Sequence, residues 1–498
     1  MNRRATRAWR FFILASLLMI WGVGLPAAMT VTDGLAPWQV LQVDGDGAAA
    51  IDCRGTLPEG AEGAVELRVV DASVAEVIAW TGAGEAVGGE WNAAVDGLPA
   101  GGPYTVEIRL ADGEASAAIE PVYAGDLWIL AGQSNMEGVG NMTDVETPHD
   151  LVQVFAMNDV WRQAEEPIHR RAESVDPVHN PRGEEGAREA REANLDVSGA
   201  VKGAGLGLTF AKEMVERTGR PVGLVPCAHG GTSMDQWDPA RRDDGGDSLY
   251  GAMLRRFDAV GGSVRGVLWY QGESDTGGDR AEAYQDKFEA FIAAVRDDLG
   301  DPELPFYYVQ LGALAQTGES VGWNTVRHAQ YLIEETVPGV AAVAAIDLPL
   351  DDWIHVGVDG LKVLGARLAD VAHRRMEGED AFPGTPRPQA MEAETAPQGR
   401  RFRVVFEGVV DGLRAPADGR VSGFRITTGS DHEAAHPIFR QEIDPDNPNA
   451  VLLWVQNFPE TPAYVWYGRG LTPFCNLTDH GGRGVLAFGP LPLPAPED

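Results

Sequence analysis

Residues 126–138 read DLWILAGQSNMEG, and this stretch decides the fold of the central part of the chain. The segment up to Ala131 is mostly apolar and has the length of a β-strand, and Gly132 ends it. Ser134 therefore falls just beyond the carboxyl end of a predicted strand. A single serine in this position is usually a turn residue or a helix cap, so its role depends on the rest of the sequence.

Further apolar runs of strand length follow, with helix-like segments between them. They are VGLVP from Val222, VRGVLWY from Val264, FYYVQLG from Phe306 and VAAVAAI from Val340. The segment AEAYQDKFEAFIAAVRDDL has the spacing of an amphipathic helix. This alternation predicts a parallel sheet that is covered by helices on both faces. Ligands of such sheets bind beyond the carboxyl ends of the strands.

Polar strings lie at that expected edge of the sheet. They are GQSNMEG around Ser134, HGGTSMDQW at 229–237, WYQGESD at 269–275, and DDWIH ending in His355. A serine hydroxyl becomes an effective nucleophile when an adjacent base takes its proton and a third group holds that base. Ser134, His355 and Asp352 can fill these roles, because one turn of chain brings Asp352 and His355 together.

In this order and at these separations, the four strings resemble the blocks of the SGNH hydrolases, in particular the carbohydrate acetylesterases and sialate O-acetylesterase-like proteins. The resemblance covers roughly residues 124–375. It implies a flavodoxin-like, three-layer α/β/α catalytic domain. It also implies a serine esterase that removes O-acetyl groups from carbohydrates through an acetyl-serine intermediate. Within that family, the oxyanion donors are expected to be the N–H of Ser134, an N–H of Gly230 or Gly231, and the side-chain amide of Gln271.

The third string departs from the broad SGNH pattern, which has Asn where this chain has Gln271. The form Tyr270-Gln271-Gly272-Glu273 is similar to that of the carbohydrate acetylesterase branch. In part of that branch this glutamate is taken as the carboxylate partner of the histidine. The spacing favours Asp352 for that role, and Glu273 remains a second candidate acid.

Side chains within the strings are candidates for substrate binding: Gln133, Asn135, Trp237 and Trp353. The two tryptophans are either core residues or platforms on which a sugar ring stacks. His229 either lines the site or is a hydrogen-bonded structural residue, and the second interpretation is favoured. His328 and His373 fall in helix-like stretches without a nucleophile nearby and are expected to be structural or surface residues.

The first residues, MNRRATRAWRFFILASLLMIWGVGL, combine a positive start with an apolar run that is short for a membrane span. Residues 1–28 are therefore predicted to be a signal peptide, with an uncleaved N-terminal anchor as the alternative. The expected location is exported, either periplasmic or extracellular. The formal net charge of −34 disfavours nucleic acid and anionic membranes as partners.

The length of 498 residues suggests more than one domain. Residues 31–122 alternate in short β-like runs and predict an N-terminal β-sandwich domain. The catalytic domain is expected at 123–380, and strand-like runs at 387–498 predict a C-terminal β-rich domain. A polar stretch at 173–196 has the composition of a loop near the site.

The three cysteines are too few for a disulfide framework. Cys227 closes a predicted strand and is expected to be a buried thiol. Cys53 and Cys475 lie in the two flanking regions, and a bridge between them requires that those regions meet in space.

Other site types find no support in the sequence. The string GAGLGL from Gly203 follows no predicted strand and lacks the third glycine of a dinucleotide-binding loop. No Gly-x-Ser-x-Gly elbow, His-Glu-x-x-His motif or paired Cys-x-x-Cys occurs. We therefore expect no cofactor and no metal. The resemblance to the carbohydrate acetylesterases implies an acetylated carbohydrate as the substrate. Two alternatives remain open: a non-catalytic glycan-binding protein with the same fold, and an esterase for lipid or aryl esters.

Overall fold

The computed structural model describes residues 29–57, 61–113, 115–192, 199–318, 321–378, 383–416, 419–429 and 432–496. The predicted signal peptide at 1–28 lies outside these ranges. Within them, no helix combines the length and the apolar character that a membrane crossing requires.

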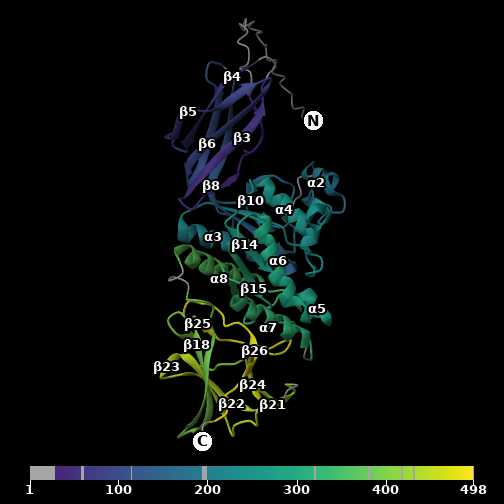
Figure 1. The fold of residues 1–498 in the computed structure, drawn as a ribbon, viewed down its shortest axis with the longest axis vertical. Coiled ribbons are helices and arrows are strands. Elements are labelled where there is room, and N and C mark those ends of the chain that lie inside the picture. Colours follow the sequence, from purple (N-terminus) through teal and green to yellow (C-terminus); the bar gives the residue numbers. More distant parts are fainter. Residues whose placement is uncertain are drawn as a thin grey trace, which may run out of the picture.

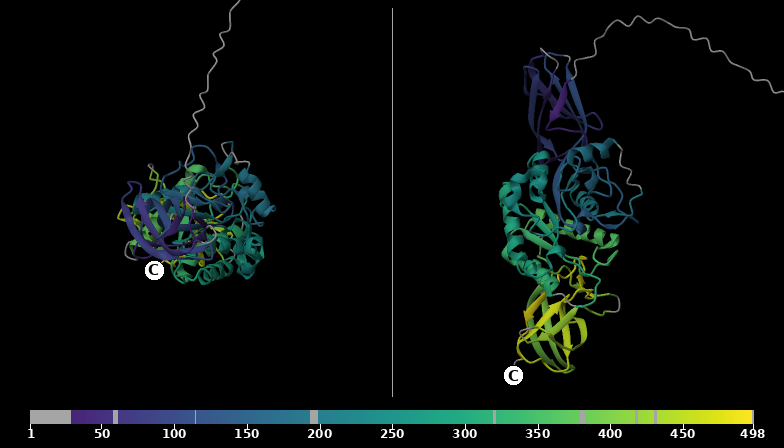
Figure 2. Two further views of the ribbon diagram at one scale, coloured as in Figure 1. Left: turned by 90° about the horizontal axis from the view of Figure 1, so that it is seen from above. Right: turned by 90° about the vertical axis from the view of Figure 1, so that its right-hand side faces the viewer.

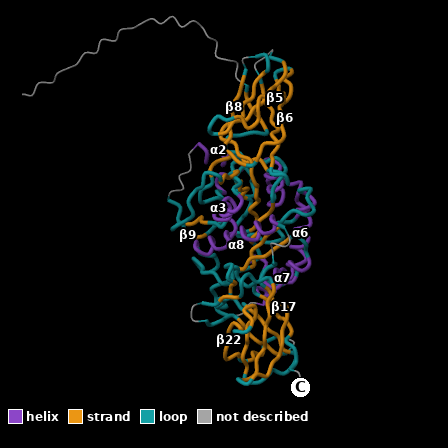
Figure 3. The backbone as a smooth tube through the Cα atoms, turned by 90° about the vertical axis from the view of Figure 1, so that its left-hand side faces the viewer, coloured by secondary structure: helices purple, strands orange, loops and turns teal. Residues whose placement is uncertain are grey.

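The molecule is elongated, and its three parts follow one another along the long axis (Figures 1 and 2). Strands make up both ends, and the helices are confined to the middle part (Figure 3). The predicted fold class, an α/β catalytic domain between two β domains, is confirmed.

The N-terminal part is an antiparallel β domain with strand order β1-β3-β6-β5-β4-β7-β8. Buried side chains alternate with exposed ones along β3 and with partly buried ones along β7, as expected of strands with one face in a core. The strands span Thr30–Asp33 (β1), Val40–Gln42 (β2), Ala48–Thr56 (β3), Gly63–Asp71 (β4), Glu76–Val87 (β5), Glu90–Pro99 (β6), Gly101–Leu110 (β7) and Ser116–Gly132 (β8).

Strand β8 belongs to two domains. Its first half pairs with β7 antiparallel, and its second half, from Asp126 onward, pairs with two parallel strands of the catalytic sheet. The expected boundary between residues 122 and 123 therefore falls inside a continuous strand and not in a linker. Because one strand serves both sheets, Ser134 lies two residues beyond a strand that is anchored in both.

The catalytic sheet has the strand order β11-β10-β13-β8-β14-β15-β16, in which β11 alone is antiparallel to its neighbour. Its strands are Val152–Phe155 (β10), Trp161–Gln163 (β11), Val222–Pro226 (β13), Gly266–Tyr270 (β14), Phe306–Gln310 (β15) and Val340–Ala344 (β16). A small separate pair joins Gly140–Asn141 (β9) to Lys202–Ala204 (β12). The predicted parallel strands are confirmed, and β10 is an additional one.

Helices cover both faces of this sheet. Helices α3 (Gly207–Thr218) and α8 (Val358–Glu377) pack together on one face, and α6 (Tyr284–Asp298) and α7 (Val321–Thr336) pack together on the other (Figure 3). The remaining helical elements are α1 (Ser134–Glu137), η1 (Arg171–Glu173), α2 (Gly183–Glu192), η2 (Pro239–Asp247), α4 (Leu249–Ala259), η3 (Glu273–Asp275) and α5 (Asp279–Glu282).

Aromatic side chains fill the two layers between sheet and helices. On the α3 face, the rings of Trp128 and Phe210 lie 5.1 Å apart, and on the α6 face those of Trp269 and Phe291 lie 4.6 Å apart. Each such pair removes a large apolar area from water and fixes the helix against the strands.

The expectation of a loop at 173–196 is wrong for residues 183–192, which form α2. Eight of these ten residues, GEEGAREARE, are Ala, Glu or Arg, and all three types favour a helix. The polar composition that suggested a loop is equally that of a solvent-exposed helix.

The C-terminal part has two four-stranded sheets, with orders β17-β18-β23-β22 and β21-β20-β24-β26. Its strands are Arg387–Ala396 (β17), Gly399–Glu407 (β18), Leu413–Arg414 (β19), Phe424–Thr428 (β20), Ala434–His436 (β21), Ile438–Asp444 (β22), Asn447–Val455 (β23), Ala463–Tyr467 (β24), Thr478–Asp479 (β25) and Phe488–Pro492 (β26). Cys53 and Cys475 are free and buried in the two β domains at opposite ends of the molecule, so the bridge between them is not formed (Figure 1).

Candidate active site

The polar strings meet at the carboxyl edge of the catalytic sheet, because β8, β13, β14 and β16 all end there. Gly132 makes the turn from β8 into α1 with a φ of 134°. A Cβ atom at this position would lie 2.2 Å from the carbonyl oxygen of Tyr270. Only glycine fits this close approach of two strand ends, and the turn directs Ser134 to the edge of the sheet.

Ser134, His355 and Asp352 form a hydrogen-bonded chain. The Nε2 atom of His355 lies 3.0 Å from the Oγ atom of Ser134, and its Nδ1 atom lies 2.8 Å from Oδ2 of Asp352. The backbone N–H groups of Ile354 and His355 both donate to Oδ1 of Asp352. In this arrangement Asp352 can hold the imidazole in one orientation, and Nε2 of His355 can accept the proton of the Ser134 hydroxyl.

The carboxylate of Asp352 is held in its charged form. Partial burial acts to raise its pKa, but the N–H groups of Ile354 and His355 and the His355 ring outweigh this and lower the pKa to about 2. The Nζ atom of Lys202, in β12, lies 3.5 Å from Oδ2 of Asp352 and adds a positive charge. Asp352 is therefore an anion at any pH at which the protein is expected to work.

Glu273, the second candidate acid, contacts a different residue. The Nδ2 atom of Asn135 donates to Oε1 of Glu273 over 2.6 Å, and Oδ1 of Asn135 accepts from the N–H of Val356 over 3.0 Å. Burial raises the pKa of Glu273. No hydrogen bond joins Glu273 to His355 in the part of the chain that the structure describes. Asn135 thus ties the Ser134 turn to the His355 loop, and Glu273 orients Asn135.

Two backbone N–H groups beside Ser134 are free to meet an oxyanion. No described residue accepts a hydrogen bond from the N–H of Ser134 or from that of Gly231, which is exposed. The N–H of Gly230, in contrast, donates to Oε2 of Glu137. Of the two candidate glycines, Gly231 therefore has the available donor.

The expectation that Gln271 supplies an oxyanion donor needs correction. Its side chain is fully buried, and its amide nitrogen donates to Oδ2 of Asp275 over 2.6 Å, to the carbonyl of Thr232 over 3.0 Å and to Oε1 of Gln133 over 3.3 Å. An amide nitrogen carries two hydrogens, so both are engaged within the protein. Gln271 joins the second and third strings together.

Three of the four residues expected to bind substrate are buried. Trp237 has no exposed surface and packs against Trp269 and Phe291, so the expectation of a substrate contact is wrong for it. Gln133 and Asn135 are also buried, and their side chains form hydrogen bonds within the protein. Trp353 is 55% exposed, two residues before His355, and is the one that can reach a ligand.

Sequence reasoning missed an ion pair beside the serine. Oε1 of Glu137 accepts from Nε of Arg171 over 2.8 Å, and Nη1 of Arg171 lies 2.8 Å from Nε2 of His229. The contact with Arg171 agrees with the favoured interpretation of His229 as a hydrogen-bonded structural residue. The His229 ring also stacks on that of His179. Glu137 lies within the first string, but nothing in the sequence indicates that Arg171 comes back to it.

Two other histidines lie away from the site. The ring of His328 stacks on Tyr331 within α7, and Nδ1 of His373 lies 3.6 Å from Glu377 within α8. Neither is hydrogen-bonded to Ser134 among the described residues. In the described residues, no cluster of three or more His, Cys, Asp or Glu side chains is arranged to hold a metal ion.

A buried histidine beneath the site makes the stability depend on pH. Burial lowers the pKa of His169 to about 3, against an ordinary value of 6.5. Below about pH 6.5 the unfolded chain binds a proton here that the folded chain does not bind, so folding stability falls as the pH falls toward 3. The expected slope is about 1.4 kcal/mol per pH unit.

We expect a smaller slope in His169→Gln, whose side chain does not titrate. Urea unfolding of both proteins at pH 6 and pH 5 gives the slope of the unfolding free energy against pH for each. Any loss of stability that the substitution causes equally at both pH values does not affect these slopes. Equal slopes would mean that His169 is protonated in the folded protein.

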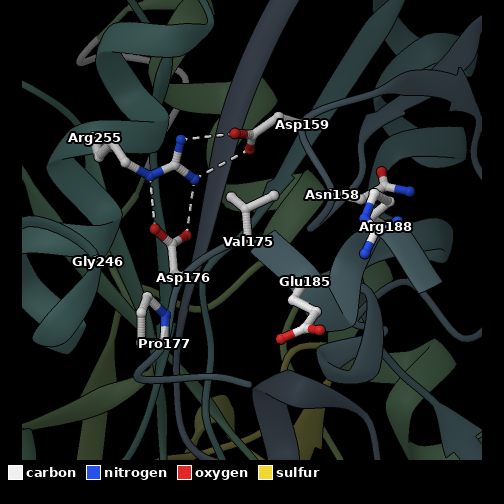
Figure 4. A pocket seen from close by; sticks show the side chains of 9 residues that line it. All are labelled: Asn158, Asp159, Val175, Asp176, Pro177, Glu185, Arg188, Gly246 and Arg255. Carbon is white, nitrogen blue, oxygen red and sulfur yellow. Dashed lines mark hydrogen bonds and ion pairs between the residues drawn. The ribbon is translucent and has the colours of Figure 1, made fainter. Parts of the chain in front are cut away.

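A cavity of about 730 Å³ lies on the η1 side of the domain and contains neither Ser134 nor His355. In it Arg255 donates to Asp159 and to Asp176 at once (Figure 4). The remaining lining residues are Asn158, Val175, Pro177, Glu185, Arg188 and Gly246. This cavity is therefore separate from the nucleophile.

Known proteins resemble this chain in sequence and in fold. Residues 124–374 match the family model described as carbohydrate esterase, sialic acid-specific acetylesterase. A probable carbohydrate esterase of Arabidopsis thaliana is 32% identical over 272 residues, which cover 50% of this chain and 90% of that protein. The sialate O-acetylesterase of Rattus norvegicus is 24% identical over 309 residues, which are 50% of this chain and 55% of that one. The chain thus spans about half the length of that relative.

The crystal structure of a carbohydrate acetylesterase from Xanthomonas citri is similar over most of the length. It covers 92% of this chain and 99% of its own, with a TM-score of 0.63 and 24% sequence identity. At this identity the likeness shows that the fold is shared. With a catalytic domain that matches the family model throughout, the chain belongs to the carbohydrate esterase family of sialic acid-specific acetylesterases.

Proposed function

We propose that this carbohydrate esterase removes O-acetyl groups from glycans by a serine mechanism. Ser134 is the nucleophile, His355 the general base and acid, and Asp352 the carboxylate that orients the imidazole. The observation that carries the proposal is the unbroken hydrogen-bonded chain from Oγ of Ser134 through His355 to Asp352.

In the first half of the reaction, Oγ of Ser134 attacks the acetyl carbonyl carbon while Nε2 of His355 takes its proton. Charge develops on the carbonyl oxygen, and the N–H groups of Ser134 and Gly231 stabilise it. The imidazolium then gives its proton to the sugar oxygen as the ester bond breaks. The sugar alcohol leaves, and the acetyl group stays on Ser134.

In the second half, a water molecule takes the place of the sugar alcohol. His355 removes a proton from this water, which attacks the acetyl carbonyl and forms a second tetrahedral intermediate. Return of the proton to Oγ releases acetate and restores the enzyme. The fixed negative charge of Asp352 stabilises the imidazolium in both halves.

Acetate release from a panel of acetylated glycans tests the proposal. The panel contains acetylated xylan, acetylated sialosides and a long-chain lipid ester as comparison, each incubated with the chain from residue 29 onward. We expect acetate from at least one glycan and little hydrolysis of the lipid ester. Binding of the glycans without acetate release would instead favour the non-catalytic glycan-binding protein, and preference for the lipid ester would favour a lipid esterase.

A further inference from the structure

An aromatic side chain stands exposed beside the candidate nucleophile and base. Trp353 is 55% exposed, although large apolar side chains are normally buried. Its backbone is fixed, because its carbonyl accepts a hydrogen bond of 2.7 Å from the N–H of Ala315. Ala315 lies in the loop after β15, next to the end of β16. The ring is therefore presented to solvent from a well-held position.

A loop of the C-terminal domain lies against this same segment. The N–H of Leu314 donates to the carbonyl of Leu471 over 2.8 Å. The hydroxyl of Thr472 donates to the carbonyls of Leu314 and Gln316, each over 3.0 Å. The loop at 468–475 thus lies on the neighbours of Ala315 and is part of the same edge of the catalytic sheet.

A buried arginine fixes that loop to the catalytic domain. Arg327, on α7, is fully buried and donates to the carbonyls of Gly468 and Gly470 over 3.0 and 2.6 Å. It also donates to the carbonyls of Leu311 and Gly312. One guanidinium therefore connects both loops, and breaking them apart would cost this buried charge its bonds to Gly468 and Gly470.

Phe474 follows Thr472 by two residues and is 75% exposed, whereas its neighbour Cys475 is buried. The domain junction thus brings together two loops from different domains, one with exposed Trp353 two residues before His355 and one with exposed Phe474 two residues after Thr472. The backbone of Trp353 and the hydroxyl of Thr472, two residues before Phe474, both bond to the segment at 314–316.

We propose that Trp353 and Phe474 form a platform for the sugar rings that flank the acetylated residue of an extended glycan, an inference that rests on the proposed esterase function. A sugar ring has an apolar face of C–H groups, and covering such a face with an aromatic ring removes both from water. The strong net negative charge of the chain favours a neutral polymer over an anionic one. The C-terminal domain then contributes directly to the choice of substrate.

Kinetics of Phe474→Ala on a neutral acetylated polymer and on an acetylated monosaccharide test the platform. We expect the KM for the polymer to rise about tenfold relative to that for the monosaccharide, with kcat on the polymer retained. Phe439→Ala is the matched control, because Phe439 is 63% exposed but lies on β22, at the far end of the same domain (Figure 1). Equal polymer KM values for the two variants would overturn the platform.

A binding measurement separates this inference from the esterase chemistry. In a Ser134→Ala background, which leaves the polymer uncleaved, affinity for the acetylated polymer is compared with and without Phe474→Ala by calorimetry. We expect about tenfold weaker binding in the double variant. If affinity is unchanged, the platform is wrong even where acetate release is normal, and if wild type releases no acetate, the esterase proposal fails whatever the affinity.

Discussion

Ser134→Ala is expected to lower kcat for acetate release by about 10⁴-fold or more while the protein stays folded. The hydroxyl of Ser134 is the atom 3.0 Å from Nε2 of His355, and alanine leaves the base without a group to deprotonate. The fold should tolerate the change, because the side-chain oxygen accepts or donates no other hydrogen bond among the described residues. Acetate assays with both proteins, together with circular dichroism, measure the effect.

Ser274→Ala is the control for this substitution. Ser274 lies in the third string, three residues after Gln271, and its backbone N–H contacts Gln133, but its hydroxyl does not contact His355. We expect its activity to stay within a few-fold of wild type. If Ser134→Ala retained comparable activity, Ser134 would be a turn residue and another group would carry the chemistry.

Asp352→Asn is expected to lower kcat by about 10⁴-fold, whereas Glu273→Gln should lower it by less than about tenfold. The Asp352 carboxylate accepts directly from Nδ1 of His355, and an amide there no longer stabilises the imidazolium or fixes its tautomer. Glu273 reaches His355 only through Asn135 and Val356, and glutamine retains an oxygen for the Asn135 bond. Steady-state kinetics of the two variants compare the candidate acids.

Both substitutions replace a carboxyl group by an amide and keep the side-chain shape, so each serves as the control of the other. A larger loss in Glu273→Gln than in Asp352→Asn would reverse the assignment. It would mean that the His355 loop rearranges when substrate binds and that the imidazole then turns toward Glu273.

The sequence was sufficient to predict the edge at which the site forms. Apolar runs such as VGLVP and VAAVAAI have no alternation, and in a chain that alternates strands and helices this means a strand buried on both faces. The polar strings that follow them must then share one edge. The proximity of Asp352 and His355 was also predictable, because three residues in one turn cannot separate far.

The hydrogen-bond partners within the site could not be predicted from the strings. Gln271 and Trp237 have the chemistry of a substrate contact, and whether they face the ligand or the core depends on which neighbours reach them. Asp275 and Thr232 reach Gln271, and Trp269 reaches Trp237. These contacts join segments that are far apart in the chain, and no local pattern records them.

The contacts at the domain junctions could not be predicted from the sequence either. The β-like runs at 31–122 suggested a boundary at residue 122, but β8 continues through it because the strand is long enough to serve two sheets. The contact of the C-terminal loop with the segment at 314–316 depends on Arg327, which in the sequence is only one arginine on a helix. Long-range contacts of this kind follow from the packing of whole domains.

The measurement that tests the central proposal most directly is the location of the acetyl group during turnover. The protein is mixed with excess aryl acetate, quenched in acid within the first turnovers, digested and analysed by mass spectrometry. We predict one acetyl group on the hydroxyl of Ser134 in wild type and none on that peptide in Ser134→Ala. Acetylation of a different residue at the rate of turnover, or acetate release by Ser134→Ala at the wild-type rate, would contradict the proposed mechanism.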